Sequence, residues 1–231
     1  MSLMLLPTPG QVLILQLPAA LSKKMVNFYQ YSCFMSTTLL LLAAGASTRM
    51  GLPKMFLYYK GQTLLHHITG EALAITQIPV FVVTGDHTAA VKEILRESPV
   101  SVLHNPHWQE GMGGSIRTGI QGILNAGPAP DAVLITVCDQ PFINAVLLQQ
   151  LMDAKTTTGK GIVGCTYDET IGTPVLFDKK YYEALLQLNG QQGAKRILQQ
   201  FPDDVATIPF PLGGVDIDTP EDYDRLLNNR L

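Results

Sequence analysis

The chain has 231 residues, 46% hydrophobic and 15% charged, so it can bury a sizeable core and lacks the composition of a disordered protein. Sixteen Lys and Arg against 19 Asp and Glu give a net charge of −3 without a basic stripe, which argues against non-specific nucleic-acid binding. This length suits one α/β domain.

The cysteines and the apolar runs indicate the compartment. Cys33, Cys138 and Cys165 form no C-x-x-C pair, which fits neither a disulfide framework nor a zinc site and predicts a reducing cytoplasm. No apolar run is long enough to span a bilayer, so we expect no membrane association. Prolines interrupt the apolar stretch from Met1 to Leu21 and no basic segment precedes it, which disfavours a signal peptide. We therefore predict a non-core extension over residues 1–36 and a single domain over 37–231.

Strands and helices alternate along the predicted domain. We expect strands at Leu39–Ala44, Pro79–Thr84, Val100–Leu103, Ala132–Val137, Gly161–Cys165, Thr173–Phe177, Val205–Pro209 and Val215–Asp218. We expect helices at Thr63–Thr76, His87–Glu97, Ser115–Leu124 and Asn144–Lys155, and further helices starting at Lys180, Gln192 and Thr219. Asp86 and Thr219 are the predicted N-caps of two of these helices. The alternation predicts a single-domain, Rossmann-like three-layer sandwich with a mostly parallel mixed sheet.

The first strand leads into a loop that holds Gly45, Ser47, Arg49, Gly51 and Lys54. Small residues let backbone N–H groups approach a ligand, and two cations in one loop can bind a polyanion, which predicts a phosphate-rich ligand. The loop matches neither the P-loop, which needs Lys and Ser or Thr after its second glycine, nor the dinucleotide fingerprint. P-loop hydrolysis and hydride transfer therefore lose support.

Carboxylates follow other predicted strands. Asp139 follows Ala132–Val137, and Asp216 and Asp218 lie near the C-terminus. Ligands bind beyond the carboxyl ends of the strands in open α/β sheets, and Mg²⁺ can be shared between carboxylates and a nucleotide's phosphates. We predict that Asp139 and Asp218 bind Mg²⁺. A turn cap at Pro141 remains the alternative for Asp139, and a helix-entry role remains open for Asp218.

The stretch from Leu42 to Lys54, Leu-Ala-Ala-Gly-Ala-Ser-Thr-Arg-Met-Gly-Leu-Pro-Lys, resembles the opening motif of nucleotidyltransferases. Three further stretches, Asn105–Ser115, Cys138–Pro141 and Asp216–Pro220, resemble the molybdenum cofactor cytidylyltransferase group. The resemblance covers nearly the whole chain beyond the extension. It implies the nucleotide-diphospho-sugar transferase type of fold and the transfer of CMP from CTP to the terminal phosphate of molybdopterin, with release of pyrophosphate.

The resemblance also implies roles for individual residues. Arg49, Lys54 and Asp139 would be catalytic, and Asp139 and Asp218 would hold the metal. The implied nucleotide-binding residues are Leu42, Ala43, Ala44, Gly45, Ala46, Gly85, Gly113 and Ser115.

Two positions bear on the substrates. The pair Ala43-Ala44 follows the cytidylyl group, whereas the guanylyl group has Ala-Gly there, so CTP is favoured over GTP. Gln191 stands where the related enzymes often have an acid, which weakens the assignment of the acceptor. The alternatives are a nucleotidyltransferase for another sugar or alcohol phosphate, and an accessory protein that carries molybdenum cofactor to a molybdenum hydroxylase.

Overall fold

A computed structural model describes residues 35–45, 50–75, 78–190 and 193–228. The strands are β1 (Thr37–Ala43), β2 (Tyr58–Tyr59), β3 (Gln62–Thr63), β4 (Val80–Thr84), β5 (Val100–His104), β6 (Ala132–Val137), β7 (Ile162–Tyr167), β8 (Thr170–Asp178) and β9 (Val205–Pro209). The α-helices are α2 (Leu64–Leu73), α3 (Thr88–Ile94), α4 (Met112–Ala126), α5 (Ala145–Thr158), α6 (Tyr182–Leu186), α7 (Lys195–Gln200) and α8 (Pro220–Leu227). Short 3₁₀ segments are η1 (Lys54–Phe56), η2 (Trp108–Glu110), η3 (Lys179–Tyr181), η4 (Pro202–Asp204) and η5 (Pro211–Gly214).

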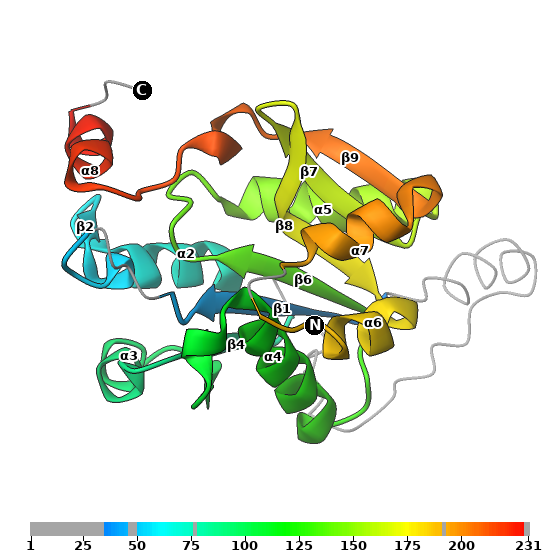
Figure 1. Ribbon diagram of the computed structural model, residues 1–231, viewed down its shortest axis with the longest axis horizontal. Coiled ribbons are helices and arrows are strands. Elements are labelled where there is room, and N and C mark those ends of the chain that lie inside the picture. Colours follow the sequence, from blue (N-terminus) through cyan, green and yellow to red (C-terminus); the bar gives the residue numbers. More distant parts are fainter. Residues whose placement is uncertain (1–34, 46–49, 76–77, 191–192, 229–231) are drawn as a thin grey trace, which may run out of the picture. The chain divides into compact units, whose positions relative to one another are not determined.

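Seven strands form one mixed sheet in the order β5-β4-β1-β6-β8-β7-β9 (Figure 1). The strands from β5 to β6 pair in parallel, and β8 pairs antiparallel with both β6 and β7. The parallel β7–β9 pair completes the sheet. This arrangement confirms the predicted mostly parallel mixed sheet.

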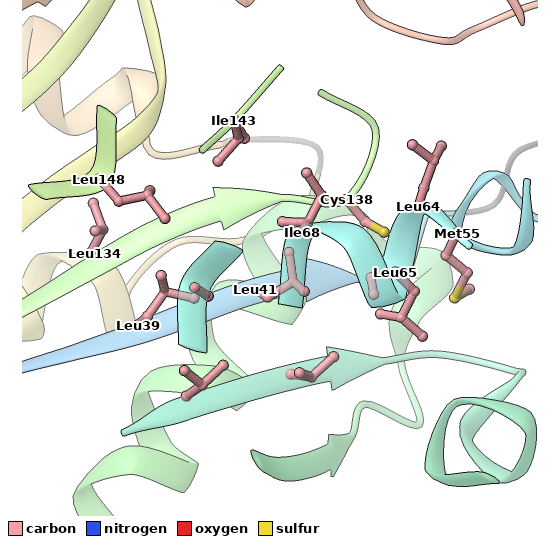
Figure 2. Close-up of a cluster of buried hydrophobic side chains, with 14 of the residues drawn as sticks. Leu39, Leu41, Met55, Leu64, Leu65, Ile68, Leu134, Cys138, Ile143 and Leu148 are labelled. Carbon is pink, nitrogen blue, oxygen red and sulfur yellow. The ribbon is translucent and has the colours of Figure 1, made fainter. Parts of the chain in front are cut away.

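Both faces of β1 are buried, as its apolar run predicts. Leu39 and Leu41 pack into a cluster that α2, α3, α5 and α8 cover, whereas Leu40 and Leu42 pack into a second cluster under α4, α6 and α7. Figure 2 shows part of the first cluster, including side chains of α2 and α5 beside β1 and β6. The two clusters and the sheet make the three layers of the fold.

The starts of α5 and α8 are capped at the residues where the sequence predicts these helices to begin, whereas one predicted cap is wrong. Thr219 and Asp222 form a capping box at the start of α8, and Asn144 accepts a hydrogen bond from the Leu147 N–H at the start of α5. The predicted cap at Asp86 is wrong, because α3 begins at Thr88 and its N-cap residue is His87. The Thr88 hydroxyl instead donates back to the Gly85 carbonyl over 2.8 Å.

The strand predicted at Val215–Asp218 is also absent, since the described chain has no strand there. The alternation of Val, Asp, Ile and Asp does describe which side chains point inward, because Ile217 is fully buried while Asp216 is exposed. The turn of η5 precedes this segment, and the Ile217 N–H donates to the Asp139 carbonyl instead of to a strand neighbour. The segment is thus fastened to the residue that follows β6.

Candidate active site

Lys54 lies between two carboxylates at the carboxyl ends of the central strands. Its ammonium is 3.3 Å from Asp139 Oδ2 and also contacts Asp218 Oδ1, and its side chain is only 15% exposed. Asp139 follows β6, whereas Asp218 immediately precedes the capped helix α8. Residues separated by 85 and 164 positions in the sequence therefore meet at one point.

Local structure fixes the direction of the Lys54 side chain. Pro53 has an extended backbone before η1, and Met55 is buried in the core beside it. Burial lowers the pKa of Lys54, but the hydrogen bond from Lys54 to Asp218 and the charges of Asp139 and Asp218 outweigh it. The pKa of Lys54 is raised as a result, so the side chain stays an ammonium at neutral pH.

Asp216 adds negative charge to the same region. Loss of hydration raises its pKa to about 6, and the neighbouring carboxylates of Asp139 and Asp218 contribute to the shift. A site whose carboxylates repel one another in this way is suited to bind a cation.

The geometry also tests whether a divalent metal fits. Asp139 and Asp218 both reach a single ammonium, so their oxygens are close enough to share one cation. Among the described residues, no group of three or more His, Cys, Asp or Glu side chains is arranged to hold a metal alone. Carboxylate oxygens that leave most coordination positions to water and phosphate suit Mg²⁺ or a similar hard cation. The donor set fits such an ion.

The described residues that are predicted to bind the nucleotide come from the end of β1, the end of β4 and the start of α4. Leu42 and Ala43 end β1, and Ala44 and Gly45 follow it. A Cβ added to Gly45 would meet no atom of the described residues within 4 Å. Ala46 and Arg49 lie outside the described residues, and their roles remain predictions.

Gly85 lies at the end of β4 and has a packing reason to be glycine. A Cβ at this position would come within 2.6 Å of the Trp108 side chain, which packs over the strand end. Any side chain at this position would therefore collide with the indole.

Gly113 and Ser115 lie in the first turn of α4 and not in the loop before it. The Gly113 N–H donates to the Gly190 carbonyl over 3.1 Å. The buried Ser115 hydroxyl accepts from Asn105 Nδ2 over 3.1 Å and retains its own proton as a donor. Both residues thus hold the end of α4 in place.

Sequence reasoning did not identify the hydrogen-bond network of Gln140. Gln140 is buried and donates from Nε2 to the Gly213 carbonyl over 2.7 Å and to the Tyr167 hydroxyl over 3.2 Å. Its Oε1 accepts from the Thr173 hydroxyl over 3.1 Å. Gln140 therefore ties the β7–β8 hairpin and the segment before Asp216 to the end of β6. Its place in the motif Cys138–Pro141 was the available signal, but the partners lie 27 to 73 positions away.

Comparison with known proteins decides the family. The model of the MobA-like NTP transferase domain matches residues 39–205, which is most of the chain. The chain belongs to this family. The match includes the β1 motif, Lys54 and Asp139.

Individual relatives agree with the fold. The crystal structure of the Rv0371c homologue from Mycobacterium sp. strain JC1 has a TM-score of 0.71 and 26% identity, covering 84% of this chain and 96% of that one. Rv0371c from Mycobacterium tuberculosis in complex with manganese has a TM-score of 0.69 and 23% identity, covering 84% and 98% of the two chains.

Among curated proteins, the bifunctional protein GlmU from Acinetobacter baumannii strain AYE is 32% identical over 143 residues. The alignment covers 60% of this chain and 30% of GlmU, so the chain matches about a third of that protein's length. None of the helices in the described ranges is long and apolar enough to cross a bilayer.

Proposed function

We propose that the protein is a divalent-metal-dependent cytidylyltransferase that moves CMP from CTP to the terminal phosphate of molybdopterin and releases pyrophosphate. The convergence of Lys54, Asp139 and Asp218 at one edge of the sheet carries the proposal. The family assignment supports the reaction class. The Ala43-Ala44 pair supports CTP as the donor and so contributes the choice of base.

The reaction needs positioning and charge neutralisation more than it needs a base. A terminal phosphate is already anionic at neutral pH, so it can attack the α-phosphorus of the donor without losing a proton. Lys54 leaves its two carboxylate partners when the triphosphate enters, and its ammonium then stabilises the charge that develops on the leaving pyrophosphate. Arg49, from the same loop, shares that role.

Asp139 and Asp218 become available to a divalent cation once Lys54 turns to the phosphates. Mg²⁺ held there would neutralise the triphosphate and keep its oxygens in place. The manganese complex of Rv0371c, a protein of the same fold, agrees with a divalent ion in this role. The free thiols of Cys138 and Cys165 are consistent with a cytoplasmic enzyme.

The test measures pyrophosphate release with each of the four NTPs and Mg²⁺, with and without molybdopterin. Release that requires both CTP and molybdopterin supports the proposal. Release with another phosphorylated acceptor alone would instead indicate a different nucleotidyltransferase. Tight binding of molybdopterin without release from any NTP would indicate a carrier that serves a molybdenum hydroxylase.

Asp139→Ala should lower turnover by about a hundredfold or more, because the site loses a carboxylate that acts in the transition state. The matched control is Asp203→Ala, which removes an exposed carboxylate from η4 and should leave turnover unchanged. Circular dichroism checks that both variants fold. Wild-type turnover in folded Asp139→Ala would remove Asp139 from the site.

A further inference from the structure

Asn105 is a buried residue that connects the end of β5 to the start of α4. Its Oδ1 accepts a hydrogen bond from the His107 N–H over 3.0 Å, and its Nδ2 donates to the Ser115 hydroxyl over 3.1 Å. A backbone N–H can only donate, so the bond to His107 fixes which atom of the side-chain amide is the oxygen. The amide nitrogen must therefore point to Ser115.

The direction of this bond determines what the Ser115 hydroxyl can do. An amide NH₂ group only donates, so the Ser115 oxygen accepts and its proton points away from Asn105. No other described residue forms a hydrogen bond with this hydroxyl, and Ser115 is buried. A buried hydroxyl proton that lacks an acceptor has lost its hydration at a cost in free energy. The pair thus presents a donor that has no acceptor within the described part of the chain.

Ser115 lies near the ends of β1 and β4. The next residue, Ile116, packs with Leu42 of β1 in one buried cluster, and both line a cavity under α4 and α7. Trp108 of η2, the segment that precedes α4, packs against Gly85 at the end of β4. Leu42 and Gly85 are predicted nucleotide-binding residues, so the Ser115 hydroxyl lies among the elements where the nucleotide is expected.

A donor that is held in this direction selects for an oxygen atom of the ligand. Ser115 is in the first turn of α4, where the helix dipole and the backbone N–H groups favour negative charge. An amino group in the same place would set one donor against another. Phosphate oxygens and the carbonyl oxygen of a base are both acceptors, and a nucleotide carries both.

We propose that Asn105 is a positioning residue, which holds the Ser115 hydroxyl as a hydrogen-bond donor to an oxygen of the bound nucleotide. The inference rests on the proposed function and deepens it, because it names the residue that sets the direction of this contact and the kind of ligand atom that accepts it. Asn105 does not touch the nucleotide and acts through Ser115.

Binding of an NTP with Mg²⁺ to the full chain, measured by isothermal titration calorimetry without an acceptor, tests the proposal. The probe is whichever of the four NTPs the wild type binds most tightly. Asn105→Asp keeps the shape of the side chain and the oxygen that faces His107, but it replaces the donor to Ser115 by an acceptor. The Ser115 hydroxyl then donates to the new carboxylate, so binding should weaken about tenfold or more. Ser115→Ala should weaken it about tenfold.

The double variant separates the positioning effect from the added charge. The new carboxylate repels phosphates whether or not the Ser115 hydroxyl is present. In the Ser115→Ala background no hydroxyl can be reoriented, so Asn105→Asp should weaken binding there by a factor about three times smaller than in the wild-type background. Equal factors in the two backgrounds would overturn the proposal.

Asn125→Asp is the matched control. It adds the same charge at the exposed, distant end of α4 and keeps the oxygen that accepts from Gln121 Nε2, so it should bind the probe like the wild type. Circular dichroism checks the fold of every variant. If Asn105→Asp does not fold, Asn105→Leu takes its place and should weaken binding about threefold, because the hydroxyl is no longer held in one direction. Wild-type affinity in Ser115→Ala, or in Asn105→Leu, would overturn the proposal.

Tripolyphosphate with Mg²⁺ distinguishes the two kinds of acceptor oxygen. Weaker binding of both the NTP and tripolyphosphate to Ser115→Ala supports the proposal with a phosphate oxygen as the acceptor. Weaker binding of the NTP alone supports it with an oxygen of the nucleoside.

Turnover separates this inference from the proposed function. If the variants change NTP binding as expected but molybdopterin yields no pyrophosphate, the role of Asn105 stands and the cytidylyltransferase proposal fails. If molybdopterin-dependent release occurs with a wild-type KM for CTP in both Asn105→Asp and Ser115→Ala, the role of Asn105 fails and the function stands.

Discussion

Lys54 connects the loop after β1 to carboxylates from two other parts of the chain. Its ammonium lies between Asp139 and Asp218, the two carboxylates that are proposed to bind the metal ion. An ammonium in that position limits the repulsion between the carboxylates while no substrate is bound. In the proposed mechanism the same residue then becomes a ligand of the triphosphate.

Gln140 shows why a residue can matter at this site without touching a substrate. Its side-chain amide holds Tyr167, Thr173 and the Gly213 carbonyl around the end of β6. Buried amide groups are costly to leave unpaired, so these contacts stabilise one arrangement of the neighbouring Asp139.

Asp216 makes the stability of the protein depend on pH. Below pH 3.8 its carboxyl group is protonated in both the folded and the unfolded chain. Between pH 3.8 and about 6 the unfolded chain loses this proton while the folded chain retains it, so the free energy of unfolding falls as pH rises. Above pH 6 both states are ionised and the loss is constant.

Asp216→Asn should therefore raise the melting temperature at pH 7.5 and leave it unchanged at pH 3.5. The gain should be about 1 kcal/mol or less, because the side chain is exposed and solvent screens the repulsion, which corresponds to about 2–4 °C. Thermal unfolding at both pH values measures the difference, and Asp203→Asn is the control. An equal gain at both pH values would mean that the ionisation of Asp216 is not the cause.

Helix α4 packs against β1 so closely that some of its positions require glycine. A Cβ on Gly119 would lie 2.4 Å from Leu40 Cδ2, and Leu40 is fully buried. Gly70 is the contrasting case, since it is an exposed residue of α2 and a Cβ there would meet none of the described atoms within 4 Å.

The two glycine-to-alanine changes should therefore act in opposite directions. Gly119→Ala should lower the free energy of unfolding by about 1–2 kcal/mol, because overpacking against β1 exceeds the gain in helix propensity. Gly70→Ala should raise it by about 0.5–1 kcal/mol through helix propensity alone. Urea unfolding measures both. Stabilisation by both changes would show that α4 can move away from β1 at little cost.

The sequence predicted those elements whose evidence is local. The apolar run of β1 predicts a buried strand, and Thr219 with Asp222 predicts a capped helix start, in both cases from neighbouring residues alone. Both predictions are confirmed. The antiparallel insertion of β8 between β6 and β7 depends on pairing between distant segments, which no local pattern encodes. The extended segment at 215–218 was predicted as a strand because alternation shows which side chains are buried but not whether a partner strand exists.

Prediction of the site depended on a rule about the whole sheet. Lys54, Asp139 and Asp218 were chosen because they lie near the carboxyl ends of predicted strands, and those ends share one edge in a parallel sheet. The contact between Lys54 and Asp139 follows from this topology, whereas Asp218 reaches Lys54 from the segment before α8, which is not a strand. The cavity under α4 and α7 could not be predicted in the same way, since it needs β8 beside β6 and α7 above them.

The hydrogen bonds of Ser36 bear on where the folded domain begins. The compact unit that the structure describes begins at Met35, and the family match starts at residue 39. The Ser36 hydroxyl donates to Asp131 Oδ2 over 2.9 Å, and the Ser36 carbonyl accepts from the Ala132 N–H. Ser36, which the sequence placed in the extension, thus fastens the start of β1 to the start of β6.

A chain that begins at Met35 should fold with a melting temperature within about 2 °C of the full chain and retain its turnover, because β1 keeps its contacts. A chain that begins at Thr37 should be less stable by about 1–2 kcal/mol, since it loses the hydrogen bonds of Ser36 and leaves Asp131 with fewer partners. Thermal unfolding of the three chains makes the comparison, and the two shortened chains differ by only two residues. A large loss of stability already at Met35 would place residues 1–34 within the folded domain.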